Sequence, residues 1–228
     1  VNLTNLNINA LCKSKYTLKE GGTLGDLYTT SNLRFNDNGY VEVDKNGNLL
    51  MTDEGEDIYL GSVFPNHNLA WRNDFSYKGI NLGVLFTARL GGVCYSATQA
   101  NLDLYGVSEA SAAARDAGGV LINGREMVDA QKWYQAIGSQ SGLPQYYLYS
   151  ATNVRLQELS LGYTFPRKWF RNKLGLTVSF VGRNLWMIYC KAPFDPEAVA
   201  STGLNYQGID YFMMPSMRNL GFNVKFQF

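Results

Sequence analysis

Residues that could do chemistry are few in this sequence, and their spacing does not group them. His67 is the only histidine, so a Ser-His or Cys-His catalytic pair would have to use that one side chain. Cys12, Cys94 and Cys190 are odd in number and lie far apart, which favours isolated thiols over a disulfide framework or a zinc site. We therefore predict that the chain is not an enzyme and contains no catalytic residue.

Two acidic clusters have the chemistry to bind a hard cation. Four of the five residues at 53–57 carry carboxylates, and a second pair of carboxylates flanks Pro196. Ca²⁺ takes oxygen ligands of this kind, but neither cluster has the spacing of an EF-hand loop. Solvated surface charge is the expected role, so no metal and no cofactor is predicted, with Ca²⁺ in these loops as the alternative. The residues concerned are Asp53, Glu54, Glu56, Asp57, Asp195 and Glu197.

Composition narrows the class of protein. The net charge is +1 and basic runs are absent, so nothing indicates a nucleic-acid partner. No apolar stretch approaches the roughly 18 residues that a membrane-spanning helix requires. Aromatic residues make up 14% of the chain and 23 residues are glycine, which is typical of β-barrels with aromatic girdles.

The segment 218–228 has the clearest structural pattern. Its apolar residues are Leu220, Phe222, Val224, Phe226 and Phe228, and polar residues or glycine stand between them. Such alternation places every apolar side chain on one face of a β-strand. A strand that is apolar on one face, polar on the other and aromatic at its end is predicted to cross a membrane as part of a β-barrel.

Four earlier segments alternate in the same way and are predicted to be further strands. They are 69–77, 80–90, 154–165 and 174–188. Within 154–165 the apolar positions change from even to odd numbers, which predicts a bulge near Gln157 and Glu158.

The connections between these strands alternate between short and long. Tight turns are predicted at 77–79 and 166–172, and the long connections are 91–153 and 190–216. In outer-membrane barrels the short turns are periplasmic and the long loops lie outside the cell. We therefore predict an extracellular loop region over 1–66, and barrel strands with two long extracellular loops over 67–228.

Local signals predict some structure inside these loops. Alternating residues around an Asn-Gly pair predict a β-hairpin at 40–48. Helix-forming runs predict two short helices, at 110–117 after Ser108 and at 127–137.

About five strands cannot close a barrel. Open sheet edges inside lipid would leave backbone groups unpaired, at a cost of several kcal/mol each. The sequence also lacks an initiating Met and a signal peptide, although a barrel of this type must be exported. We therefore expect the chain to be a piece of a longer precursor that supplies the remaining strands.

Several motifs resemble the C-terminal part of the SusC/RagA-like TonB-dependent transporters of Bacteroidetes. They are TLKEGGTLGDLY at 17–28, GSVFP at 61–65, NVRLQELSLGYTFP at 153–166, GRNL at 182–185, APFDPE at 192–197 and NYQGID at 205–210. The resemblance implies an all-β fold, a transmembrane antiparallel barrel of about 22 strands of which this chain holds the last five or so, with short helices in its long loops.

The resemblance also implies a function and partners. It implies a bacterial outer-membrane importer of oligosaccharides or peptides that works with a SusD-like surface lipoprotein. The partners implied are that lipoprotein, the TonB complex through N-terminal parts absent from this sequence, the remaining strands and plug of the same precursor, and outer-membrane lipid. The alternative is a surface-assembly or adhesive barrel without active transport. An outer-membrane hydrolase is disfavoured because the chain has one histidine.

Two groups of residues are candidates for the transport site. The first group alternates with the apolar positions of the predicted strands and so faces the lumen side. Its members are Arg72, Asp74, Arg89, Arg155, Gln157, Arg183 and Lys225. These residues would solvate the barrel interior and pair with a plug, or Arg155 and Arg183 would help to hold a polar solute.

The second group consists of aromatic residues in the long loops. They are Trp133, Tyr134, Tyr146, Tyr147, Tyr149, Tyr206, Tyr211 and Phe212. Flat aromatic rings stack on sugar rings or peptide side chains, and they also suit a buried contact with a lid protein. The sequence leaves both roles open.

Overall fold

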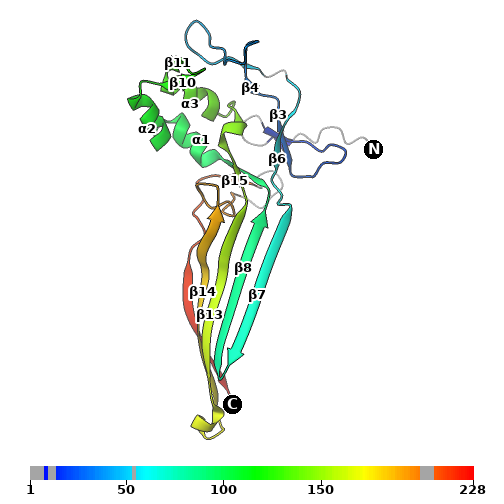
Figure 1. The fold of residues 1–228 in the computed structure, drawn as a ribbon, viewed down its shortest axis with the longest axis vertical. Coiled ribbons are helices and arrows are strands. Elements are labelled where there is room, and N and C mark those ends of the chain that lie inside the picture. The colour runs from blue at the N-terminus through cyan, green and yellow to red at the C-terminus, as the bar shows by residue number, and fades with distance from the viewer. Residues whose placement is uncertain (1–7, 10–13, 53–54, 201–207) are drawn as a thin grey trace. The chain divides into compact units, whose positions relative to one another are not determined.

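The protein is mostly β-structure with a few short helices (Figure 1). The structure, a computed structural model, describes residues 8–9, 14–52, 55–200 and 208–228. These residues fall into two compact units. We call 65–91, 151–198 and 214–228 the strand unit, and the described parts of 1–64, 92–150 and 199–213 the loop unit. Within the described residues, no helix is long and apolar enough to span a membrane.

The strand unit is a five-stranded antiparallel sheet in the order β16-β14-β13-β8-β7 (Figure 1). Its strands are β7 (His67–Tyr77), β8 (Ile80–Leu90), β13 (Asn153–Phe165), β14 (Gly175–Cys190) and β16 (Asn219–Gln227). All five strands expected from alternation are therefore confirmed. The sheet is open at β7 and β16 within the described residues.

Short turns join these strands at one end of the sheet. Lys78 and Gly79 between β7 and β8 both have positive φ, which is the geometry of a two-residue hairpin turn. A Cβ on Gly79 would lie 2.7 Å from the carbonyl oxygen of Thr164, so only glycine fits here. Between β13 and β14, Pro166 precedes a single 3-10 turn, η2 (Arg167–Phe170). The long connections leave from the opposite end, where His67 pairs with Leu90.

The two faces of the sheet differ sharply in polarity. Cross-strand register stacks apolar side chains with one another: Phe180 lies between Leu161 of β13 and Phe222 of β16. Trp71 pairs with Phe86 across β7 and β8, with ring centroids 5.6 Å apart. These large side chains are mostly exposed. A continuous exposed apolar surface of this kind is what a membrane or another protein covers.

The expected bulge in β13 is confirmed, and the structure shows its partner. The register shifts between Leu156 and Glu158, which leaves Gln157 as the extra residue. On β14, Asn184 has a φ of 50° between the paired residues Arg183 and Trp186. Because both strands bulge at the same level, the apolar residues keep one face above and below it. A second shift, after Val154, had no signal in the sequence.

The loop unit contains small sheets built from segments far apart in the chain. One sheet has the order β1-β2-β3-β6 and another the order β12-β9-β15, with β15 parallel to β9. The strands are β1 (Ile8–Asn9), β2 (Ser14–Tyr16), β3 (Asp26–Thr29), β6 (Ile58–Ser62), β9 (Val93–Ser96), β12 (Leu148–Ser150) and β15 (Ile209–Asp210). The loop unit also contains two antiparallel strand pairs. They are β4 (Asn32–Leu33) with β5 (Met51–Thr52) and β10 (Val120–Ile122) with β11 (Glu126–Val128).

Three short helices pack in the loop unit, and each begins at a side-chain cap. They are α1 (Ala97–Leu104), α2 (Glu109–Asp116) and α3 (Ala130–Gly138), and a 3-10 turn, η1 (Pro144–Tyr147), follows. Ser108 caps α2 as expected, by accepting a hydrogen bond from the Ser111 amide. The expected helix at 127–137 starts later, because 126–128 form β11 and Asp129 is the cap of α3. Helix α1 was not predicted.

The core of the loop unit joins all of its chain segments. Leu33, Tyr95, Ile137, Tyr147 and Ile209 are buried in one cluster. Tyr95 and Tyr147 meet edge to face with centroids 6.5 Å apart. The hairpin expected at 40–48 is present as a tight turn, with a bridge between Val43 and Leu49.

The polarity of the two sheet faces can be tested with one residue from each. A cation on the lipid side at the membrane midplane costs about 2–4 kcal/mol, whereas a polar lumen tolerates it. Phe180→Arg in the full-length protein should therefore reduce the amount of folded barrel, while Ser179→Arg should not. The measurement is the heat-modifiable band on gels of outer membranes. Phe180→Leu controls for lost packing. Equal losses in both arginine variants would mean that the two faces do not differ in environment, and a larger loss for Ser179→Arg would mean that the faces are reversed.

Candidate functional site

The polar face of the sheet carries a chain of ion pairs. Arg72 Nε lies 2.9 Å from Asp74 Oδ2, and Arg72 Nη1 lies 3.7 Å from Glu158 Oε1. Arg183 Nε contacts the same Glu158 at 3.0 Å. One carboxylate thus links two guanidinium groups from β7 and β14 across the sheet, and we call Arg72, Asp74, Glu158 and Arg183 the polar ladder.

Glycine makes room for the polar ladder. A Cβ on Gly83 would lie 2.8 Å from Asp74 Oδ1 and 2.5 Å from Ser160 Oγ. Any larger residue at this position would therefore push the Asp74 side chain away. Toward the short turns, Asn81 donates a 2.9 Å hydrogen bond to Thr164 and accepts a 2.7 Å bond from Ser76. This face is therefore polar and internally hydrogen-bonded along several strands.

Arg155 on β13 is buried, with 1% of its side chain exposed. Its guanidinium forms a two-pronged ion pair with Asp195, through Nη2 to Oδ1 and through Nη1 to Oδ2 at 3.2 Å. Nε donates to Asn153 Oδ1 at 3.0 Å, and Glu197 lies 3.4 Å from Nη2. A buried cation is tolerated when it is paired in this way.

Asp195 is held by more than Arg155. Its carboxylate also accepts hydrogen bonds from the hydroxyl and amide of Ser216 and from the Glu197 amide. Burial by itself raises the pKa of Asp195, but the hydrogen bonds from Arg155 and Ser216 outweigh it and hold that pKa well below its usual range. We call Arg155, Asp195 and Ser216 the buried strap, because it fastens two loop segments to β13.

The buried strap corrects one sequence-based hypothesis. Arg155 was a candidate to hold a polar solute, yet it is covered and its charge is already paired. Arg183, by contrast, is exposed and retains surface beyond its contact with Glu158. Lys225 is exposed, Arg89 is half-buried, and both lie on strands at the parity expected. That this face lines a lumen stays a prediction.

The loop aromatic residues separate into core and surface. Tyr147 is 2% exposed and belongs to the core of the loop unit, so it is not a surface contact. Trp133 and Tyr134 of α3 pack partly against that core, and Tyr149 is half-buried beside β9. Trp133 also meets Tyr146 edge to face at 6.0 Å. The rings of Trp133, Tyr134 and Tyr146 therefore make contacts within the loop unit.

Tyr211 and Phe212 remain at the surface, 50% and 56% exposed. Their rings lie edge to face with centroids 5.3 Å apart. The backbone beneath them is anchored, because the Phe212 amide donates to Thr98 Oγ1 at 2.7 Å and Ser96 donates to the buried Asp210 at 2.8 Å. The pair is therefore held in an exposed position. Tyr206, which was predicted to join it, lies outside the described residues.

Residues considered for catalysis or metal binding are scattered. His67 is exposed at the start of β7, Cys94 is buried and Cys190 is half-buried. Asp57 pairs with Lys15 at 2.7 Å and with Lys19 at 3.2 Å, and the hydrogen bond from Lys15 lowers its pKa. In the part of the chain that the structure describes, no three His, Cys, Asp or Glu side chains come together as a metal site. Cys12, Asp53 and Glu54 lie outside that part.

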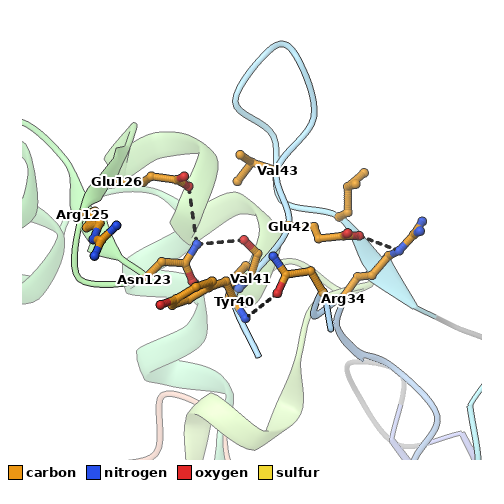
Figure 2. Close-up of a pocket in the computed structure, with 10 residues that line it drawn as sticks. Arg34, Tyr40, Val41, Glu42, Val43, Asn123, Arg125 and Glu126 are labelled. Atoms are coloured by element: carbon orange, nitrogen blue, oxygen red, sulfur yellow. Dashed lines mark hydrogen bonds and ion pairs between the residues drawn. The ribbon is translucent and has the colours of Figure 1, made fainter. Parts of the chain in front are cut away.

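A pocket of about 530 Å³ opens in the loop unit, and sequence reasoning missed it (Figure 2). Its walls come from 34–50 and from the β10–β11 hairpin. Asn123 and Gly124 both have positive φ and form the turn of that hairpin. An Asn-Gly pair between apolar residues is a strong hairpin signal, and it could have located one wall. The residues lining the pocket are Arg34, Asn36, Tyr40, Val41, Glu42, Val43, Leu50, Asn123, Arg125 and Glu126.

These features define a class of protein. An antiparallel sheet with an apolar exposed face and a polar face crossed by ion pairs has the two-sided polarity of strands in outer-membrane β-barrels. No family model matches the sequence.

More particularly, the chain is similar to TonB-dependent transporters. It is 26% identical over 198 residues to the TonB-dependent receptor P3 of Formosa agariphila, a match that covers 82% of this chain and 19% of the receptor. TonB-dependent receptors are proteins of the bacterial outer membrane, which is the location of this chain. The resemblance read from the sequence motifs is thereby confirmed, and the similar proteins are receptors and transporters rather than enzymes.

Solved structures show the same fold. The RagAB peptide importer in its 'closed-closed' state matches with a TM-score of 0.51 and 19% identity, over 94% of this chain and 24% of the importer chain. Its 'open-open' state matches with a TM-score of 0.51 and 16% identity, over 89% of this chain and 23% of that chain. This chain therefore spans about a quarter of the length of the structures it matches.

The buried strap can be tested by removing one partner. Arg155→Met leaves Asp195 buried without its cation, and breaking a buried pair typically costs about 3–5 kcal/mol. We expect faster protease cleavage within 190–216 of the full-length protein, measured by mass spectrometry of the fragments. Arg183→Met is the matched control, because its exposed pair with Glu158 contributes little. Similar cleavage rates for both variants would show that Arg155 does not hold these segments.

Proposed function

We propose that this chain forms the C-terminal strands and outer loops of a TonB-dependent outer-membrane importer, which takes up oligosaccharides or peptides with a SusD-like surface lipoprotein. The observation that carries the proposal is the two-faced five-stranded sheet in a chain similar to a TonB-dependent receptor over 82% of its length. Outer-membrane nutrient import in general agrees with that similarity. The substrate and the lipoprotein are inferred.

The open sheet supports assembly into a larger barrel. The outer edges of β7 and β16 have no neighbouring strand in the described residues. Inside lipid each unpaired backbone group costs several kcal/mol, so these edges require further strands. We propose that the rest of a barrel of about 22 strands supplies them, and that a plug and a TonB-binding segment lie in the same precursor. The polar ladder would then face the plug or the passing substrate.

The exposed aromatic pair supports a protein partner. Tyr211 and Phe212 sit on the connection that leads into β16, with Met213 exposed beside them. Aromatic residues and Met are enriched at the centres of protein interfaces, and rigid backbone anchoring lowers the entropy cost of binding. We propose that these residues contact the lipoprotein lid at the extracellular mouth.

The lid contact can be tested by replacing Tyr206, Tyr211 and Phe212 with Ala in the full-length importer. A central interface aromatic can contribute about 2 kcal/mol, so we expect much less lipoprotein to co-purify and growth on the imported nutrient to slow. Barrel abundance should not change. Tyr105→Ala is the control, because Tyr105 is an exposed tyrosine of the same unit. Unchanged lipoprotein recovery and growth in the triple variant would remove this contact from the proposal.

The same strains separate import from adhesion. An importer of this class needs the TonB complex, whereas an adhesive barrel does not. Uptake of the nutrient should therefore stop when TonB is deleted while the barrel stays in the membrane. Full uptake without TonB would contradict the proposed function.

A further inference from the structure

The pocket of the loop unit is lined by side chains that can recognise a ligand (Figure 2). Its volume of about 530 Å³ falls within the range of about 300–1,000 Å³ found for small-molecule sites. Figure 2 shows Tyr40 and Asn123 between the Arg34–Glu42 pair and the side chains of Arg125 and Glu126. The pocket therefore combines one aromatic ring with charged groups on two sides.

The walls of the pocket are held in place by hydrogen bonds. Asn123 uses its amide like a backbone unit, because its Oδ1 accepts from the Val41 amide at 2.8 Å and its Nδ2 donates to the Val41 carbonyl at 2.9 Å. Asn36 Oδ1 accepts from the Tyr40 amide at 3.0 Å. Arg34 Nε contacts Glu42 at 2.7 Å. The two loops are thus fixed to each other before any ligand arrives, which lowers the cost of binding.

Charge disfavours an ionic ligand. The lining contains the two cations Arg34 and Arg125 and the two carboxylates Glu42 and Glu126. These charges balance, so a ligand with a net charge would meet as much repulsion as attraction. A hydroxyl group, however, both donates and accepts hydrogen bonds, and it can use guanidinium and carboxylate groups together. A ligand with several hydroxyls therefore suits this lining.

The backbone of the pocket disfavours a peptide. Extended peptides are commonly bound through main-chain hydrogen bonds to an unpaired strand edge. Here the Arg34, Glu42 and Leu50 amides donate to the carbonyls of Leu50, Arg34 and Glu42 in turn. Both polar backbone groups of Val41 are taken by Asn123. Recognition is therefore left to side chains, among them Tyr40, which is 46% exposed, and Arg125, which makes no ion pair with any described residue.

From this geometry we infer that the pocket binds a neutral saccharide unit, stacked on Tyr40 and hydrogen-bonded by Arg125 and Glu126. An aromatic face offers apolar contact to the C–H side of a sugar ring, and the flanking ionic groups pair with its hydroxyls. The biological role of this binding, capture of a glycan by the outer loops before uptake, rests on the proposed import function. Binding itself requires neither TonB nor a lipoprotein.

The experiment measures binding of the purified full-length protein in detergent to an array of neutral oligosaccharides, with a library of tripeptides beside it. We expect at least one neutral glycan to bind. Tyr40→Ala should weaken that binding about tenfold or more through loss of the ring contact, and Arg125→Gln should weaken it severalfold. Tyr40→Phe keeps the ring and should retain most of the affinity, while Tyr105→Ala should not change it.

Three results would overturn the inference. They are the absence of binding to any neutral glycan, binding of tripeptides alone, and glycan binding that Tyr40→Ala and Arg125→Gln leave intact. Arg125→Gln changes an exposed side chain and removes the guanidinium with its charge and most of its donors, so it decides the question even if Tyr40→Ala disturbs the loop. TonB-dependent uptake can persist when this binding is absent, and binding can persist when uptake is lost, so the two proposals fail independently.

Discussion

The period of two along each strand is the constraint on which the rest of the structure depends. Neighbouring side chains must face opposite sides, so a sheet with one apolar and one polar face needs strict alternation in all five strands at once. Cross-strand register then pairs apolar side chains on one face, such as Phe180 with Phe222, and polar side chains on the other, such as Arg183 with Glu158. Where alternation slips at Gln157, the opposing strand bulges as well, and both faces stay intact.

The loop unit follows a different rule, because its short strands and helices cannot hold a core alone. Its buried cluster draws Leu33, Tyr95, Ile137 and Ile209 from three separate chain segments that are interrupted by sheet strands. Each helix begins at a Ser or Asp cap, whose side chain accepts a hydrogen bond from the first turn and fixes where the helix starts. Polar side chains then satisfy backbone groups that have no strand partner. The side-chain amide of Asn123, for example, bonds to both the amide and the carbonyl of Val41.

The strands could be predicted from the sequence because alternation is a local signal, and the bulge near Gln157 followed from a change of parity. The caps Ser108 and Asp129 are also local, although only the first was recognised. The burial of Tyr147 and the pairing of Arg155 with Asp195 were not predictable, because both depend on residues distant in the chain coming together. For the same reason the pocket was missed, although one of its walls carries a plain Asn-Gly turn. The lumen and lid roles of the remaining candidates stay predictions.

The buried strap also limits which sequence changes the long connection after β14 can accept during evolution. Asp195 lies on the connection after β14, while its partner Arg155 belongs to a strand of the sheet. A loop that is lengthened or exchanged beyond Glu197 leaves this contact untouched, but one that replaces Asp195 removes the two-pronged partner of the buried Arg155. Variation in the connection is therefore expected to concentrate between 198 and 213, with the residues next to the sheet retained. An engineered loop exchange should therefore begin after Glu197 and end before Ser216, so that the buried strap is kept, and should not extend to the ends of β14 and β16.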